Sequence, residues 1–183
     1  GGAGTQTAAL SAGGGNPGKI AFSEEYNGSA WAEQNDMNRP RSYTAGFGVQ
    51  TAAVVVGGFV PPAQATSEEY DGTSWTETTN LNTARGAIAG AAGTTASGMV
   101  FGGLANNRGG QGAPASALVE AWDGTSWTET SNLATARFLP GGAGTSATSV
   151  LAFGGRTAPP TGSFTTATEE FSEAGVIKTI TDS

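Results

Sequence analysis

One pattern recurs three times along this chain: a tryptophan, an arginine ten residues later, and a Gly-Gly pair sixteen or seventeen residues after the arginine. The successive tryptophans are 44 and 52 residues apart. A period of this length indicates an array of similar supersecondary units, because such units bury their hydrophobic faces by stacking on one another. The pattern comprises Trp31, Trp75 and Trp127; Arg41, Arg85 and Arg137; and the pairs Gly57 and Gly58, Gly102 and Gly103, and Gly154 and Gly155.

Each repeat has the pattern of four short β-strands. The chain contains 30 glycines, and its apolar residues come in short runs bounded by Gly or Pro, such as residues 52–56. Runs of this kind are typical of strands, and no window keeps a helical period. Asn-Gly or Asp-Gly dipeptides at 27–28, 71–72 and 123–124 favour tight hairpins, because glycine tolerates a positive φ. Four short strands at this period predict an all-β propeller fold, with four antiparallel strands in each blade.

Four such units divide the chain, with approximate bounds 1–37, 38–81, 82–133 and 134–183. Together they predict a single propeller domain. Residues 7–14 match residues 51–58, so the first unit starts after the position of its arginine. In the last unit, Val176 stands where the tryptophan is expected. A divergent terminal unit is typical of a cap, so we expect a natural end at Ser183 and an N-terminus cut inside a larger array.

The order of these motifs resembles the kelch repeat of β-propellers: an arginine, a hydrophobic strand ending in Gly-Gly, and an aromatic residue followed by a tryptophan. The resemblance covers nearly the whole chain, although the spacing from Tyr70 to Trp75 is shorter than in typical kelch units. The Thr- and Gly-rich sequence of residues 68–78 also resembles sequences of kelch-like virion or surface structural proteins of marine phages and bacteria. Small propellers with four blades exist, but kelch propellers usually have more. The resemblance therefore leaves two alternatives: four blades that close on themselves, or a ring completed by upstream blades or a partner chain.

The repeated glycines and aromatic residues have structural interpretations. A glycine pair at the end of a strand suits a close approach of two backbones and a positive φ. Repeated aromatic residues in a propeller usually pack between neighbouring blades, with stacking on a sugar ring as the alternative. Two aromatic positions recur: Tyr26, Tyr70, Trp122 and Phe171 at one, and Trp31, Trp75 and Trp127 at the other.

A glutamate recurs in all four units, and an arginine in three, at a fixed register. This regularity favours a repeated Glu–Arg or Arg–backbone contact that ties blades together. The resemblance keeps a second interpretation open, since kelch domains that bind acidic peptides use arginines at the mouth of the central channel. Arg41, Arg85 and Arg137 are therefore candidate ligand-binding residues, and the glutamates are Glu24, Glu68, Glu120 and Glu169.

The segments that follow the glycine pairs vary most, at residues 15–18, 59–66, 104–116 and 156–166. Recognition is commonly placed in loops on a rigid scaffold. The longest of these loops carries amide groups and one arginine that suit polar ligands such as glycans, and an insertion without a function is the alternative. Its candidate ligand-binding residues are Asn106, Asn107, Arg108 and Gln111.

Composition argues against several functional classes. Fifteen acidic and eight basic residues give a net charge of −7, which disfavours nucleic-acid binding. The absence of His and Cys excludes Ser-His-Asp and Cys-His catalysis, His/Cys metal sites and the copper site of galactose oxidase-like enzymes. Residues 71–75 resemble the Asp-box of sialidases but are one residue short. We expect no catalytic residue, cofactor or metal, and the lack of a long apolar run predicts no membrane span.

The sequence thus predicts a non-catalytic binding module, an extracellular or virion-associated adhesin that recognises a glycan or a protein surface. A structural propeller that makes contacts between identical copies is the first alternative. A polysaccharide-active enzyme that uses two carboxylates is the second.

Overall fold

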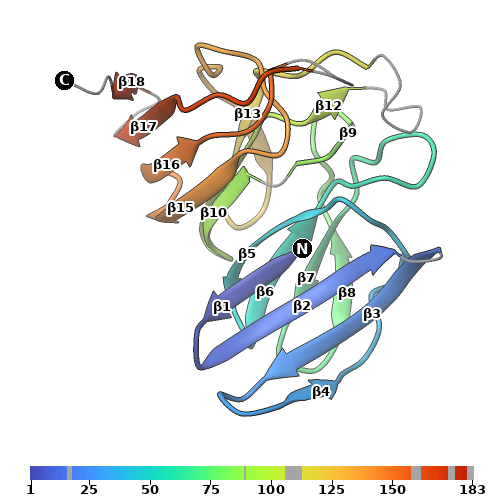
Figure 1. The fold of residues 1–183 in the computed structure, drawn as a ribbon. Helices are drawn as coiled ribbons and strands as arrows, with labels where there is room; N and C mark the ends of the chain where they lie inside the picture. Colours follow the sequence, from blue (N-terminus) through green and yellow to red (C-terminus); the bar gives the residue numbers. More distant parts are fainter. Residues whose placement is uncertain (16–17, 89, 106–112, 158–161, 173–175, 181–183) are drawn as a thin grey trace.

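The structure is a computed structural model, and it describes residues 1–15, 18–88, 90–105, 113–157, 162–172 and 176–180. The described residues form β-strands and their connections, without a helix. Sixteen of the strands make four antiparallel sheets of four strands each, which follow one another along the chain (Figure 1). The predicted all-β fold is therefore confirmed.

Within each sheet the strands follow one another in chain order, with β12 skipped in sheet 3, and each strand pairs with the next one of its sheet. Sheet 1 contains β1 (Gly2–Thr5), β2 (Ala8–Gly15), β3 (Lys19–Tyr26) and β4 (Trp31–Glu33). Sheet 2 contains β5 (Ala45–Val49), β6 (Ala52–Val56), β7 (Ser67–Tyr70) and β8 (Trp75–Thr78). Sheet 3 contains β10 (Gly90–Thr94), β11 (Ser97–Phe101), β13 (Val119–Trp122) and β14 (Trp127–Glu129). Sheet 4 contains β15 (Gly141–Ser146), β16 (Ser149–Phe153), β17 (Thr168–Ser172) and β18 (Val176–Ile180).

A fifth sheet, of two strands, lies outside the four-stranded sheets. It pairs β9 (Arg85–Gly86) with β12 (Leu104–Ala105), so the segment after an arginine runs beside the segment after a glycine pair. Isolated bridges repeat this arrangement between Ser42 and Phe59 and between Phe138 and Arg156. The variable loops therefore begin at one end of the sheets, next to the start of each first strand.

In three of the four sheets, the two repeated aromatic positions lie opposite each other across the last two strands, and the fourth sheet differs. Tyr70 lies opposite Trp75 across β7 and β8, and the equivalent pairs occur in sheets 1 and 3. In sheet 4, however, Phe171 lies opposite Ile177. The prediction that Val176 occupies the tryptophan position is therefore wrong by one residue, because the chain from Phe171 to its cross-strand partner is one residue longer than in the other sheets.

The four sheets form an open series. Strand β1 packs beside β5, β5 beside β10, and β10 beside β15. Of these first strands, β15 makes no comparable contact with β1, and Figure 1 shows sheets 1 and 4 at opposite ends of the series. Each inner sheet is therefore covered on both faces, and each terminal sheet on one.

Burial along the second strands follows from this arrangement. Val54 and Val56 are fully buried and belong to one apolar cluster with Trp122 and Trp127 of sheet 3. The alternate residues of β6, Ala53 and Val55, are also fully buried, but in a cluster with Leu10 of sheet 1. Because successive side chains of a strand point to opposite faces, β6 contributes to two intersheet cores at once.

Candidate binding surface

The three repeated arginines are buried, and each is paired with the repeated glutamate of its own unit. Arg85 shows the geometry: Nη2 lies 2.7 Å from Glu120 Oε1, and Nη1 donates to the carbonyl oxygens of Gly102 and Leu118 at 3.0 and 2.8 Å. The pairs are Arg41–Glu68, Arg85–Glu120 and Arg137–Glu169. The predicted Glu–Arg contact is therefore confirmed, but each pair lies within one unit and does not itself join two units. The fourth glutamate, Glu24, is exposed.

These pairs leave the arginines out of the exposed surface. The side chains of all three are 0% exposed. A ligand could reach the guanidinium groups only by displacing the glutamates and unpairing buried charges, which is costly. Arg41, Arg85 and Arg137 are therefore no longer candidates for ligand contact, because their hydrogen-bonding capacity is used inside the fold.

The glutamates also hold the segment that connects one sheet to the next, through a residue that the sequence pattern did not reveal. Glu68 Oε2 accepts from the backbone N–H of Asn38 at 2.7 Å and from its side-chain amide at 2.9 Å. Asn82 makes the same two bonds to Glu120. An asparagine three residues before the arginine was the available signal, but it occurs in only two units and is replaced by Ala134 in the last.

The glycine pairs connect neighbouring sheets through the backbone. Gly58 N–H donates to the carbonyl of Arg85 at 3.0 Å, and Gly103 N–H donates to the carbonyl of Arg137 at 2.9 Å. A Cβ on Gly102 would lie 2.5 Å from the same Arg137 oxygen. The first glycine of each pair has a φ between 64° and 70°. The structural interpretation of these glycines, a close backbone approach with positive φ, is therefore confirmed.

The repeated aromatic residues pack between sheets where a preceding sheet is present. Trp75 is 7% exposed, and its Nε1 donates to Ser23 Oγ of sheet 1 at 3.2 Å. Trp127 is 5% exposed and donates to Ser67 Oγ of sheet 2 at the same distance. The predicted packing is confirmed for these residues. It is wrong for Trp31, which is 50% exposed because no described sheet covers that face of sheet 1.

The contact between sheets 1 and 2 also raises the pKa of one side chain, Tyr70. Tyr70 is buried and donates its hydroxyl to Glu25 Oε1 at 2.9 Å. Burial, together with the bond to this carboxylate, raises the pKa of Tyr70 to about 12. The folded protein therefore favours the protonated phenol, and this contribution to stability is present below the ordinary value near 10.

We expect the stability from Tyr70 to be lost as the pH rises from about 10 through about 12. Ultraviolet titration of tyrosinate should show a component near pH 12 that disappears in a Tyr70→Phe variant. A Glu25→Gln variant keeps the phenol but removes the negative charge, so its component should move to lower pH. An unchanged titration in Tyr70→Phe would contradict this assignment.

A strained backbone position recurs beside the variable loops. Tyr43, Ala87 and Leu139 each follow an arginine by two residues, with φ angles of 55°, 52° and 51°. Positive φ is uncommon for residues other than glycine and is worth a structural explanation. Ala87 is buried, whereas Tyr43 and Leu139 are 62% and 42% exposed. The bend thus places two large side chains on the surface at the loop end of the sheets.

The loop of sheet 4 presents an aromatic ring beside a cation. Phe164 is 80% exposed, and the guanidinium of Arg156 lies 5.0 Å from its ring centroid and 6.0 Å from that of Phe138. Backbone hydrogen bonds from Thr157 to Ser163, and from Thr165 to the Gly155 carbonyl, hold the loop ends together. These contacts fix the position from which the exposed ring is presented.

The loop of sheet 2 forms a similar pair with sheet 1. Lys19 Nζ lies 5.4 Å from the ring centroid of Phe59. Gln64 stabilises this loop by donating to the carbonyls of Val60 and Pro62. A cavity of about 160 Å³ lies beside it, lined by residues 39–41 and by Val60, Gln64 and Thr66. We refer to the surface that contains Lys19, Tyr43, Phe59, Leu139, Arg156 and Phe164 as the loop surface.

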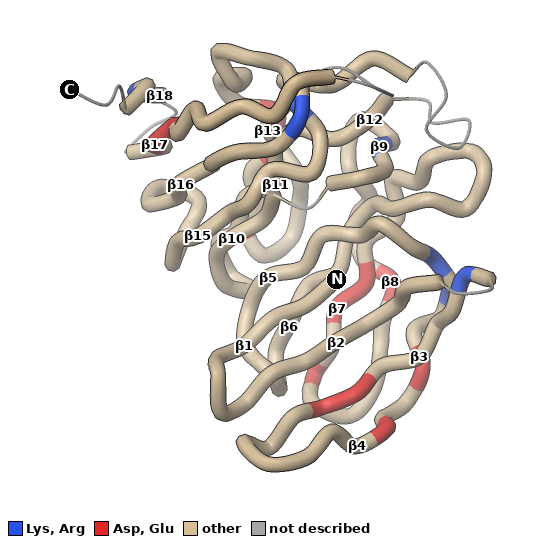
Figure 2. Tube along the Cα trace, viewed as in Figure 1, with Lys and Arg blue, Asp and Glu red and all other residues tan. Residues whose placement is uncertain are grey.

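Charge is unevenly placed around sheets 1 and 2. Figure 2 shows acidic residues along β3, β4 and β7, whereas Lys and Arg lie toward the loop end. Lys19 and Arg156 are the two cations of the loop surface. The predicted ligand-binding residues Asn106, Asn107, Arg108 and Gln111 lie outside the described residues.

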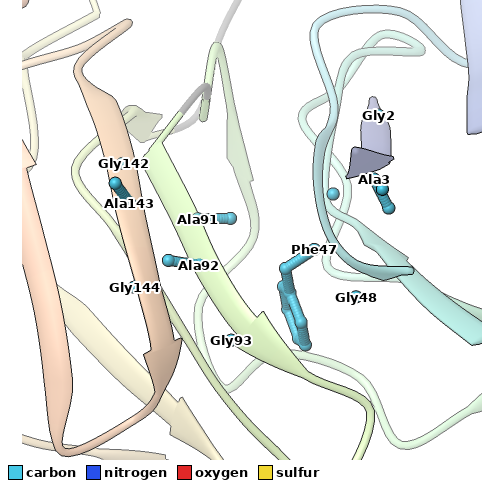
Figure 3. A pocket seen from close by; sticks show the side chains of 12 residues that line it. Gly2, Ala3, Phe47, Gly48, Ala91, Ala92, Gly93, Gly142, Ala143 and Gly144 are labelled. Carbon is cyan, nitrogen blue, oxygen red and sulfur yellow. The ribbon is translucent and has the colours of Figure 1, made fainter. Parts of the chain in front are cut away.

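A second hollow lies between the first strands of the four sheets. Its volume is about 180 Å³, and its walls are Gly and Ala residues together with Phe47 (Figure 3). The Phe47 ring packs edge-on against Trp127, with centroids 6.2 Å apart. The hollow thus offers backbone groups and methyl groups, without an ionisable lining side chain among the described residues.

The described residues show neither a candidate metal site nor a candidate membrane-spanning helix. Among the described residues, no three or more His, Cys, Asp and Glu side chains form a group suited to a metal ion. The same described ranges contain no helix long and apolar enough to span a membrane.

Comparisons with known proteins identify the fold but not a family. No protein-family model matches the chain, and no curated protein is significantly similar to it. Solved structures do match, among them the structure of YjhT, with a TM-score of 0.71 and 16% sequence identity. The match covers 88% of this chain and 52% of that one, so the chain spans about half the length of YjhT. At this identity, the likeness concerns the fold alone.

Proposed function

We propose that this chain is a non-catalytic binding module whose loop surface recognises a glycan. Phe164 carries the proposal, because its ring is 80% exposed and lies beside the Arg156 guanidinium, so one loop presents an aromatic face together with a hydrogen-bond donor. The aromatic face suits stacking on the apolar face of a sugar ring, and Arg156 suits hydrogen bonding to its oxygen atoms. The cavity beside Gln64 lies in the loop of sheet 2 and would offer a further polar contact.

The fold supports such a role. We propose that the four sheets are blades of a kelch-like β-propeller, on the basis of the repeated arginine, glycine-pair and aromatic positions. Rigid sheets carry the loops at one end, and the positive φ at Tyr43 and Leu139 adds further apolar side chains there. An adhesin that is extracellular or virion-associated would use a surface of this kind. A protein surface is the alternative ligand, because exposed aromatic residues and arginine also dominate protein interfaces.

A glycan array of neutral and acidic oligosaccharides tests the proposal. We expect binding to a subset of the glycans, and a loss of about tenfold or more in affinity for Phe164→Ala and for Arg156→Ala. Val49→Ala is the matched control, because Val49 is a 50% exposed apolar residue beside the β5–β6 turn, at the end of the sheet away from the loops. The control should bind as the unchanged protein does.

Two outcomes would count against this function. Glycan binding that is unchanged in both loop-surface variants would place the site elsewhere. An array without any bound glycan, combined with capture of a purified protein partner that depends on Phe164, would favour the alternative ligand.

A further inference from the structure

The two terminal sheets expose apolar side chains at positions that are buried in the inner sheets. On sheet 4, Leu151 and Phe153 are 38% and 43% exposed. The equivalent residues of sheet 2, Val54 and Val56, are 0% exposed. On sheet 1, Trp31 is 50% exposed, whereas its equivalents Trp75 and Trp127 are 7% and 5% exposed.

The exposed faces are opposite halves of one repeated interface. At every internal junction, the residues one and three positions before the glycine pair face the next sheet, as Val54 and Val56 face Trp122 and Trp127. Leu151 and Phe153 belong to this half and are exposed. Trp31 belongs to the other half, which faces the preceding sheet. The free face of sheet 4 therefore carries the residues that pack against the next sheet at the internal junctions, and the free face of sheet 1 carries the residue that packs against the preceding one.

The hydrogen bonds of the tryptophans give an independent match. Trp75 and Trp127 each donate to a hydroxyl of the preceding sheet, Trp75 to Ser23 and Trp127 to Ser67. At the third junction both partners are absent, because sheet 3 has Val119 at the hydroxyl position and sheet 4 has no tryptophan.

At these repeated positions, one indole donor and one hydroxyl acceptor then remain without a partner from a described neighbouring sheet. Trp31 is on sheet 1, and Thr168 occupies on sheet 4 the position that Ser23 and Ser67 occupy on theirs. The tryptophan and hydroxyl positions are thus complementary between the last sheet and the first.

We propose that two copies of this chain associate head to tail, with sheet 1 of each copy stacked on sheet 4 of the other to close a ring of eight sheets. The Trp31 indole of one copy donates to Thr168 Oγ1 of the second, and Leu151 and Phe153 cover the Trp31 ring. Such an interface is heterologous at each junction and continues the packing of the three internal junctions.

Solution mass of the chain tests the proposal, which does not depend on the loop-surface ligand. Light scattering after size exclusion should give twice 18.1 kDa. Trp31→Arg and Leu151→Arg should each give a monomer, because each variant damages both junctions of a homodimer. A mixture of the two variants should recover a dimer, since the intact sheet 4 of one variant can receive the intact sheet 1 of the other.

Controls separate association from folding. Val49→Arg changes an equally exposed apolar residue outside both terminal faces and should remain dimeric. Circular dichroism should show the same β-sheet content in all variants. Thr168→Val keeps the apolar contact but removes the acceptor, and should raise the dissociation constant about fivefold to tenfold.

Three results would overturn the proposal. One is a monomer at every concentration up to about 100 µM, well above the micromolar dissociation constants of weak specific pairs. Another is a dimer that only one of the two arginine variants abolishes, which indicates contact between identical faces. The third is an open series of larger masses that grows with concentration, which excludes a closed ring.

Discussion

An Arg85→Met variant is expected to lose about 3–5 kcal/mol of unfolding free energy, because it leaves Glu120 as a buried charge without a counterion. Arg85 and Glu120 are both 0% exposed. Burial lowers the pKa of Arg85, and the Glu120 carboxylate opposes that shift, so the two charges depend on each other. The loss is a large part of the total stability of about 5–15 kcal/mol typical of a domain. Urea unfolding followed by tryptophan fluorescence measures it.

Two comparisons make this prediction specific to a buried pair. Arg39→Met removes an ion pair of the same 2.7 Å distance to Glu77, but the side chains are 55% and 48% exposed. Its expected cost is small, because solvent screens an exposed ion pair. An Arg85→Met, Glu120→Leu double variant removes both charges and should be more stable than Arg85→Met alone. Equal effects of Arg39→Met and Arg85→Met would contradict the account.

The second large effect is expected for Gly102→Ala, at about 2–5 kcal/mol. The φ of Gly102 is 70°, a conformation that costs an L-residue about 1–2 kcal/mol. A Cβ there would lie 2.5 Å from the Arg137 carbonyl oxygen of the next unit, and relief of this overlap adds about 1–3 kcal/mol. Thermal and urea unfolding of the variant should both show the loss.

Gly154 provides the matched control. Its φ is 64°, but the nearest atom to a Cβ at this position is the Thr165 oxygen at 3.8 Å. Gly154→Ala should therefore cost only the conformational part, about 1–2 kcal/mol. Similar losses for Gly102→Ala and Gly154→Ala would show that the backbone conformation, and not the close approach of the next unit, explains the glycine pair.

Recurrence at a fixed register made the interior of this fold predictable from sequence. The pairing of Arg85 with Glu120, the intersheet packing of Trp75 and the close approach at Gly102 all repeat in other units, and each was anticipated. The predicted packing of Trp31 is wrong because its burial depends on a neighbouring sheet, which the residue pattern of its own unit does not reveal. The displacement from Val176 to Ile177 arose from one extra residue in a hairpin, which a match by spacing cannot detect.

The residues of the loop surface are harder to predict from the sequence. The left-handed conformation of Tyr43 and Leu139 has no signature in residue type, since glycine or asparagine is the usual occupant of such a position. Phe164 lies where the repeat breaks, so no second unit indicates its exposure. The stacking of Arg156 on two rings depends on how the loop returns to β17, which local patterns do not determine.

The contacts between units have a direction along the chain. The Gly58 amide donates to the carbonyl of Arg85, which is synthesised 27 residues later. The connecting segment at Asn82 is held by Glu120, which is synthesised later still. Each completed sheet therefore depends on residues made after it. During synthesis, a nascent chain would hold its latest sheet loosely until the following unit emerged, so folding should advance from the N-terminal side one junction at a time.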